Sequence, residues 1–202
     1  MSFRNPGKAA KSADKNIYLF SGGILMNIDP SVFIHPSAVL HGNLTIGKHS
    51  SIWPNAVIRA DFNYITIGRY TNIQDHATIH ASPTHPTTVG DFVTAAHSTI
   101  LHACAIGNRV MIGMGATIMD GAHIGDGTLI AAGALVKEGT IVPSGSLVVG
   151  VPGKILEGKG RPEFNEQNAV SYYVLSRKYL EGKDTISPEE LVNLMQSFRP
   201  EE

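Results

Sequence analysis

An apolar β-branched residue recurs at every sixth position from Ile112 to Val148, and this period restricts the fold more than any other feature of the chain. A glycine stands three positions after each of the first six of these residues, and a small residue follows each glycine. An α-helix would need apolar residues three and four positions apart, a spacing that this stretch does not sustain. A six-residue repeat held this long is typical of a hexapeptide parallel β-helix. The three columns are Ile112, Ile118, Ile124, Ile130, Val136, Val142 and Val148; Gly115, Gly121, Gly127, Gly133, Gly139 and Gly145; and Ala116, Ala122, Thr128, Ala134, Thr140 and Ser146.

The six-residue period is explained physically by one short strand followed by one corner. Each β-branched side chain is predicted to point inward and to pack on its equivalent one coil away, with strands about 4.8 Å apart. The glycines are predicted to occupy corners, where a side chain would clash or would need an unfavourable φ. Each coil then needs its neighbours for stability, as in other repeat proteins.

The repeat extends well beyond its most regular stretch. Apolar residues keep the same spacing from Ile34 to Ile58, continue after a phase slip near Asp61–Tyr64, and resume after a polar, proline-containing segment at residues 81–88. We therefore predict an all-β fold in which residues 30–153 form a parallel β-helix with the metal site. An N-terminal arm at residues 1–29 precedes it, and a C-terminal helical segment at residues 154–202 follows it.

Two helices are predicted after the repeat. The first is expected over residues 163–181, because Gly182 follows as a stop signal. The second is expected to begin at Ser187 as N-cap, with Pro188 in the first turn and Glu190 completing a capping box. We expect the helices to cover one wall of the β-helix or to pack on a neighbouring chain. Their predicted apolar faces are Ala169, Tyr172, Tyr173, Ser176 and Leu180 in the first, and Leu191, Leu194, Met195 and Phe198 in the second.

The composition argues against several classes of partner. A formal net charge of -1 gives the chain no general attraction to nucleic acid or anionic lipid. The single cysteine, Cys104, excludes an intramolecular disulfide framework and fits a reducing compartment. No apolar run is long enough to span a bilayer. These observations predict a cytoplasmic protein with no nucleic-acid and no membrane partner.

Three histidines carry the chemistry that the sequence suggests. His80 directly follows the inward Ile79, and His102 directly follows the inward Leu101. If the segment at 81–88 forms an outward loop with four extra residues, these histidines lie on adjacent coils and both point outward. Two imidazoles placed in this way can share a metal ion, with a Zn–N distance of about 2.1 Å. On spacing alone, ordinary solvated surface histidines explain the pattern equally well.

The third histidine, His97, stands two positions after the inward Ala95 and so belongs to a different part of the wall. It need not reach the same ion within one chain, but His97 of a neighbouring chain could do so. This placement predicts an oligomer with the metal site between subunits.

Short segments around these histidines resemble the γ-class carbonic anhydrases, and the resemblance covers roughly residues 30–180. The segments are Arg59-Ala60-Asp61, Asn72-Ile73-Gln74-Asp75, His80, Val93-Thr94-Ala95-Ala96-His97, Leu101-His102-Ala103-Cys104, Ile112-Gly113-Met114-Gly115-Ala116 and Val149-Gly150-Val151-Pro152-Gly153-Lys154. Together they are specific, whereas the hexapeptide repeat alone would also fit acyltransferases.

The resemblance implies a left-handed β-helix and a homotrimer with three metal sites between subunits. His80 and His102 would come from one subunit and His97 from the next. Zinc is the implied metal, with iron(II) or cobalt(II) as alternatives. The implied reaction is the reversible hydration of carbon dioxide to bicarbonate by a metal-bound hydroxide, because three neutral imidazoles leave the charge of the metal available to lower the pKa of bound water to about 7.

The resemblance also implies roles for residues around the metal. Arg59 would pair with Asp75 across the subunit interface, with Asp61 and Asn72 in supporting positions. Gln74 would orient the metal-bound hydroxide or bicarbonate. Tyr172 would reach the site from the C-terminal helix, although its spacing fits a packing residue equally well.

The sequence departs from the best-known branch of this family at positions that concern proton transfer. Phe62 stands where that branch has a glutamate, and the loop at residues 81–88 contains no acid. His85 in this loop could shuttle protons, because its unperturbed pKa is suitable. Alanine or histidine also replaces a glycine of the relatives at four positions: Ala60, His76, Ala96 and Ala103. At corners that tolerate a negative φ, alanine would stabilise the fold by about 0.4–1 kcal/mol.

Two other functions remain open from the sequence. A hexapeptide acyltransferase would use a histidine as base on an acyl-CoA thioester and would need no cluster of three metal-binding histidines. A metal-binding homologue with a thioesterase or structural role would keep the metal and lack the hydration activity.

Overall fold

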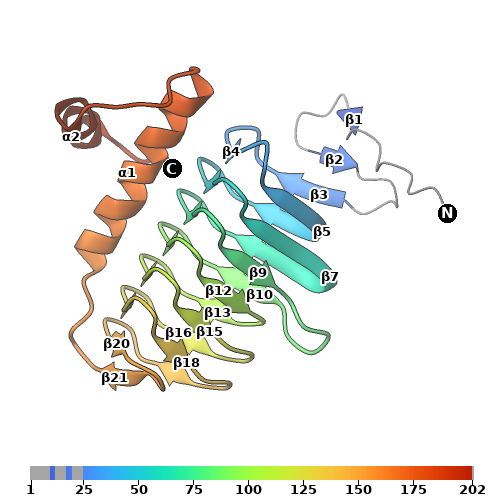
Figure 1. Ribbon diagram of the computed structural model, residues 1–202, viewed down its shortest axis with the longest axis vertical. Helices are drawn as coiled ribbons and strands as arrows, with labels where there is room; N and C mark the ends of the chain where they lie inside the picture. Colours follow the sequence, from blue (N-terminus) through green and yellow to red (C-terminus); the bar gives the residue numbers. More distant parts are fainter. Residues whose placement is uncertain (1–9, 12–16, 20–24, 202) are drawn as a thin grey trace.

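The computed structural model describes residues 10–11, 17–19 and 25–201, which form a stack of triangular coils with two helices along one side (Figure 1). The coils form a left-handed parallel β-helix, as predicted. Much of the N-terminal arm predicted at residues 1–29 lies outside the described residues, and the domain boundaries remain a prediction. Within the described part, strand β3 (Leu25–Ile28) pairs in parallel with β5 (Val39–Ile46), so coil-type pairing begins before residue 30.

The strands form three flat faces. Face I contains β3, the second half of β5 (Val39–Ile46), the second half of β7 (Val57–Ile67), β10 (Thr87–Val89), β13 (Ala105–Ile106), β16 (His123–Ile124) and β19 (Ile141–Val142). Face II contains β4 (Phe33–Ile34), β6 (Ser51–Ile52), β8 (Asn72–Ile73), β11 (Thr94–Ala95), β14 (Met111–Ile112), β17 (Leu129–Ile130) and β20 (Leu147–Val149). Face III contains the first halves of β5 and β7, β9 (Thr78–His80), β12 (Ile100–His102), β15 (Thr117–Ile118) and β18 (Leu135–Val136).

Two strand pairs lie at the ends of this stack. At the N-terminal end, β1 (Ala10–Lys11) and β2 (Ile17–Leu19) pair antiparallel with each other, and β2 pairs antiparallel with β3. At the other end, β21 (Lys154–Leu156) pairs antiparallel with β20.

The register between coils confirms both predicted interruptions. Gly42 pairs with Ala60, but Leu44 pairs with Ile65, so three extra residues bulge from β7 at the predicted phase slip. His80 pairs directly with His102, which confirms an outward loop after His80. This loop is shorter than the predicted segment at 81–88, because β10 returns to the coil at Thr87. Because parallel pairing holds equivalent residues one strand spacing apart, these two insertions decide which side chains meet.

The inward apolar column forms the core. Ile52, Ile73, Ile112 and Ile130 have no exposed surface, and their equivalents in neighbouring coils are similarly buried. Ile34 and Leu40, in the first coil, are only partly buried and pack at the edge of this cluster. A solenoid buries its core by stacking, so a terminal coil is covered less completely.

The predicted corner glycines have the left-handed φ expected of them, but other corners of the same conformation carry residues with side chains. The predicted corner glycines have φ between 63° and 68°. A Cβ on Gly115 or Gly133 would meet no atom within 4 Å, so the left-handed φ, and not lack of space, favours glycine there. Non-glycine residues have the same conformation at eight other corners: His49, Asn55, Tyr70, His76, Phe92, Ser98, Ala103 and Arg109.

Ala103 is one of these left-handed residues, with φ of 50°. The stabilisation expected for alanine at a corner with a negative φ therefore does not apply to it. His76, with φ of 60°, occupies a glycine-type corner in the same way. Both residues carry the strain of a Cβ in the left-handed region.

Helix α1 (Pro162–Leu180) runs back along face II from the last coils to the first (Figure 1). It covers one wall of the β-helix, as predicted. Asn165 of α1 is completely buried, and its amide donates hydrogen bonds to the Arg109 carbonyl at 2.9 Å and to the Thr128 carbonyl at 3.0 Å. Ala169 and Ser176 of the predicted face are fully buried, but Leu180, which ends the helix, is 56% exposed.

Helix α2 (Pro188–Ser197) begins as predicted, since the Ser187 hydroxyl accepts a hydrogen bond from the Glu190 backbone N–H at 3.1 Å. The predicted capping box is only half formed, because the Glu190 carboxylate contacts Lys178 of α1 and not the backbone of Ser187. Met195 and Phe198 pack against the corner aromatics Tyr70 and Phe92. Among residues 25–201, neither helix has the length and apolar character needed to cross a bilayer.

Candidate metal centre

His80 and His102 occupy equivalent positions at the ends of β9 and β12. The His80 Nδ1 atom lies 3.0 Å from the His102 Nε2 atom, and the ring centroids are 5.0 Å apart. The inward neighbours Ile79 and Leu101 are fully buried and fix the two backbones. Strand alternation then directs both imidazoles outward, as the sequence predicts.

The other nitrogen of each ring meets a carboxylate. His80 Nε2 lies 3.0 Å from Asp61 Oδ1, and His102 Nδ1 contacts Asp120 Oδ1. Desolvation of Asp61 acts to raise its pKa, but the hydrogen bonds with His80 and Arg59 outweigh it, so the pKa of Asp61 lies below its usual value. An ionised Asp61 is an acceptor only, and it therefore favours an N–H on the nitrogen of His80 that it contacts.

This arrangement fits a cation between the rings. If both carboxylates accept an N–H, the two nitrogens that face each other at 3.0 Å both carry lone pairs. Two facing lone pairs repel unless a proton or a metal ion lies between them. Imidazole nitrogens with carboxylates behind them are the usual surroundings of zinc and of related divalent transition metals.

His97 lies in the turn between faces II and III, after β11. Its Nδ1 atom is 3.0 Å from Asp75 Oδ2, and its side chain is 44% exposed. Face III separates this corner from the one that bears His80 and His102. Within the part of the chain that the structure describes, no three His, Cys, Asp or Glu side chains come together as a set of metal ligands.

Arg59 and Asp75, expected to pair across a subunit interface, have different partners within one chain. Arg59 contacts Asp61, and Asp75 contacts His97. Arg59 pairs in register with His80, so its side chain lies on the same outward column as the histidine pair. The pairing of Arg59 with Asp75 between subunits stays a prediction.

Gln74 is buried at the end of a directional hydrogen-bond chain. Its Nε2 donates to Asn72 Oδ1 at 2.9 Å, and Asn72 Nδ2 donates to Thr94 Oγ1 at 2.9 Å. Thr94 donates in turn to Asn168 Oδ1 of α1 at 3.0 Å. The backbone carbonyl of Val93 also accepts from Asn72 Nδ2 at 3.4 Å, which sets the direction of this chain because a carbonyl cannot donate. Among the residues that the structure describes, none donates to the Gln74 side-chain carbonyl oxygen, which is therefore available as an acceptor.

Tyr172 lies on α1, where it packs edge-on against Trp53 with ring centroids 5.5 Å apart. Burial, and secondly the negative charge of Asp75, raise the pKa of Tyr172. Its hydroxyl is therefore a stable proton donor beside the corner that carries Asp75 and His97.

His85 lies in the loop between β9 and β10, seen in green in Figure 1. Its Nδ1 atom is 3.0 Å from Thr84 Oγ1, and its backbone N–H donates to Ser82 Oγ at 3.1 Å. The His85 ring lies close to Gly121, since a Cβ built there would be 3.9 Å from His85 Nε2. The loop thus reaches the corner that bears Asp120.

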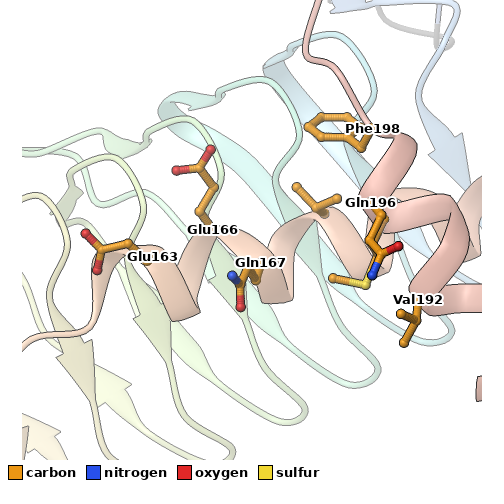
Figure 2. A pocket seen from close by; sticks show the side chains of 8 residues that line it. Glu163, Glu166, Gln167, Val192, Gln196 and Phe198 are labelled. Carbon is orange, nitrogen blue, oxygen red and sulfur yellow. The ribbon is translucent and has the colours of Figure 1, made fainter.

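Sequence reasoning missed Asp120. Its signal was its place in the turn after β15, because Leu101 pairs with Ile118 and Asp120 stands two positions after Ile118. A cavity of about 590 Å³ lies apart from this site. Figure 2 shows it between α1 and α2, lined by Glu163, Glu166, Gln167, Val170, Val192, Met195, Gln196 and Phe198.

Comparison with known proteins places the chain in a family. A hexapeptide-repeat family described as "Bacterial transferase hexapeptide (six repeats)" matches residues 26–60 and 103–138. "Gamma carbonic anhydrase 2, mitochondrial" of Arabidopsis thaliana is 43% identical over 99 residues, which cover 46% of this chain and 36% of the plant protein. "Probable carbonic anhydrase" of Methanocaldococcus jannaschii is 50% identical over 151 residues, which cover 74% of this chain and 95% of that protein. The chain belongs to the γ-carbonic anhydrase family.

Solved structures related to this γ-carbonic anhydrase family member include proteins with other names. A hexapeptide transferase family protein from Anaplasma phagocytophilum superposes with a TM-score of 0.74 at 40% sequence identity. The match covers 78% of this chain and 95% of that chain. Proteins named carbonic anhydrase and proteins named transferase are therefore both similar to this chain. The fold alone does not identify the function, which depends on the side chains at the site.

Proposed function

We propose that the protein is a carbonic anhydrase that interconverts carbon dioxide and bicarbonate at a metal ion held between subunits of a homotrimer. The observation that carries this proposal is the His80–His102 pair, in which facing nitrogens lie 3.0 Å apart and the other nitrogens contact Asp61 and Asp120. The relatives named carbonic anhydrase at 43% and 50% identity support the same reaction.

His80 and His102 of one subunit would hold the metal with His97 of the next. Zinc is the metal that we propose, with iron(II) or cobalt(II) as substitutes, because a set of three imidazoles suits all of them. When bound, such a metal supplies a Lewis acid that lowers the pKa of coordinated water to about 7.

The surface of face III supports assembly between copies of this chain. Val39 and Ile100, both on this face, are 54% and 43% exposed, and Met114 beside the His97 corner is 58% exposed. Exposed apolar side chains next to half-exposed Arg59 and His97 are suited to an interface. A second subunit that covers this face would bring its own His97 corner against the pair.

The residues around the metal would bind and orient the reactants. Gln74 presents a carbonyl oxygen whose direction is set from α1, so it can accept a hydrogen bond from bicarbonate. Tyr172, kept protonated by the raised pKa, can donate to a carboxylate oxygen. Arg59, on the column of the histidines, can attract bicarbonate and pair with Asp75 of a neighbour.

His85 would carry the proton to solvent. Its exposed ring lies over the corner that bears Asp120, on a loop that the coil periodicity does not require. An imidazole whose charge can change near neutral pH is suited to this task. A cytoplasmic location is also part of the proposal, because a single cysteine, Cys104, can form no disulfide within the chain and fits a reducing compartment.

A second candidate function is acyl transfer from acyl-CoA, which the name of the Anaplasma protein favours. In that reaction a histidine acts as general base, and neither a metal nor His97 of a neighbour is required. A metal-binding homologue with a thioesterase or structural role would bind the metal and lack hydration activity.

The experiment that separates these functions combines metal analysis with stopped-flow hydration of carbon dioxide. We expect stoichiometric zinc per chain, or uptake of zinc or cobalt, together with hydration activity that chelation removes. Absence of metal and of any response to zinc or cobalt would exclude both metal-dependent functions. Bound metal without hydration activity would favour the thioesterase or structural homologue.

A further inference from the structure

Asp120 lies in the turn that follows β15, one coil beyond His102. Its carboxylate reaches across the strand spacing and contacts the His102 Nδ1 atom. The Asp120 side chain is 31% exposed, and that of His102 is 34% exposed, so the pair lies at the rim of the candidate site. Neither the resemblance nor the comparisons assign a role to this aspartate.

The contact has a consequence for the other nitrogen of His102. A carboxylate accepts a hydrogen bond and cannot donate one, so it selects the tautomer with the proton on Nδ1. The lone pair then lies on Nε2, which is the atom 3.0 Å from His80. A carboxylate behind an imidazole also fixes the ring orientation and makes the opposite nitrogen a stronger metal ligand.

We propose that Asp120 is a positioning residue for His102, holding the imidazole so that Nε2 is presented to the metal. This proposal rests on the proposed function, since it concerns one ligand of the same metal. The next coil carries an acidic residue at the equivalent corner. Glu138 precedes the left-handed Gly139 there, just as Asp120 precedes the left-handed Gly121. Glu138 is exposed and one coil further from His102, so it offers a matched control.

The test measures cobalt(II) and zinc(II) affinity by chelator competition in wild type, Asp120→Asn, Asp120→Ala and Glu138→Gln. We expect Asp120→Ala to weaken affinity by about 10- to 100-fold and to change the visible absorption of the cobalt form. Asp120→Asn should fall between wild type and Asp120→Ala, because its amide oxygen still accepts the hydrogen bond but carries no charge. Glu138→Gln should bind like wild type.

A second measurement needs no metal and keeps the proposal testable if Asp120→Ala does not fold. Nitrogen-15 NMR of metal-free wild type and Asp120→Asn reports which ring nitrogen of His102 carries the proton. We expect the Nδ1–H tautomer in wild type and a larger share of the Nε2–H tautomer in Asp120→Asn.

Two results would overturn the role of Asp120 while the metal site itself stands. One is wild-type metal affinity in both Asp120 variants, in a protein whose binding is lost in His80→Ala. The other is an Nε2–H tautomer of His102 in the wild type. A wild-type protein that binds no metal would instead contradict the proposed function.

Discussion

His80 and His102 meet because their separation of 22 residues equals one coil plus the extra residues of the loop between β9 and β10. Parallel register places one imidazole over the other, with His80 Nδ1 3.0 Å from His102 Nε2. His97 is only five positions before His102, yet it lies on another corner of the triangle. Two histidines can share an ion when they lie at the same corner of adjacent coils, even if they are far apart in sequence.

Mixed trimers test whether the metal is shared between subunits. His97→Ala and His102→Ala should each abolish metal retention when expressed alone. When the two variants are co-expressed, some interfaces combine intact His80 and His102 of one chain with intact His97 of the other. We expect part of the bound metal and of the hydration rate to return in these trimers. A site built within one chain would show no recovery, because every chain lacks one ligand.

His85→Ala tests the proton shuttle. We expect a lower kcat with an unchanged kcat/KM and unchanged metal content, because the ring lies on a loop outside the ligand set. Imidazole buffer should restore kcat by carrying the proton in place of the side chain. His123→Ala, which removes an exposed histidine of face I, is the control and should behave like wild type. If imidazole gives no recovery, the shuttle role of His85 is wrong.

Thr94→Val tests the hydrogen-bond chain that orients Gln74. Valine keeps the shape of threonine but removes the hydroxyl that connects Asn72 to Asn168 of α1. We expect kcat to fall by about 10- to 100-fold while metal affinity is kept. Trp53, the only tryptophan, packs on Tyr172 and Tyr179, so its fluorescence reports whether α1 stays docked. Thr66→Val on face I is the matched control. Equal activity of the two variants would argue against a role of this hydrogen-bond chain in orienting Gln74.

Ser98 and Gly115 test the cost of left-handed corners, since they occupy equivalent turns of adjacent coils with φ of 61° and 68°. Gly115→Ala should destabilise the protein by about 1–2 kcal/mol, because the space is open and only the φ is unfavourable. Ser98→Gly should stabilise it by about 1 kcal/mol for the same reason. Urea unfolding measures the change in the free energy of unfolding for both variants. Glu138→Ala, at an exposed residue without a positive φ, is the control. Effects of the same sign in the two corner variants would refute this explanation.

Glu201 tests how the C-terminal residues hold α2 in place. Its carboxylate lies 3.1 Å from His49 Nε2, and its backbone N–H donates to the Tyr70 hydroxyl at 2.9 Å. The hydrogen bond and the charge of His49 lower the pKa of Glu201 from the ordinary value of 4.5. A pKa lowered on folding adds stability above the unfolded pKa, and this stability is lost as pH falls through the folded pKa.

We therefore expect Glu201→Gln to be less stable than wild type near neutral pH and the difference to shrink as pH falls below 4.5. Urea midpoints measured across this range check the prediction, with the exposed Glu157→Gln as control. A difference that widens in acid would show that the His49 contact does not stabilise the ionised form.

The repeat by itself determined the coil, the inward column and the outward direction of His80 and His102. A solenoid makes this possible because each coil contacts only its neighbours, so sequence spacing converts directly into position. The N-cap at Ser187 was also predictable, because capping depends on residues close in sequence. Leu180 was misplaced because its burial depends on how α1 lies against face II.

Only the tertiary structure decided which groups surround the ring nitrogens of His80 and His102. Asp61 and Asp120 reach the two histidines from different coils. Asn168 of α1 is connected to Gln74 through Thr94 and Asn72. These contacts depend on side-chain rotamers and on the docking of α1, neither of which the six-residue period specifies. Left-handed corners at His49, Tyr70 and Phe92 escaped prediction for a related reason. Packing of those rings on one another and on α1 holds them in a conformation that their residue types alone disfavour.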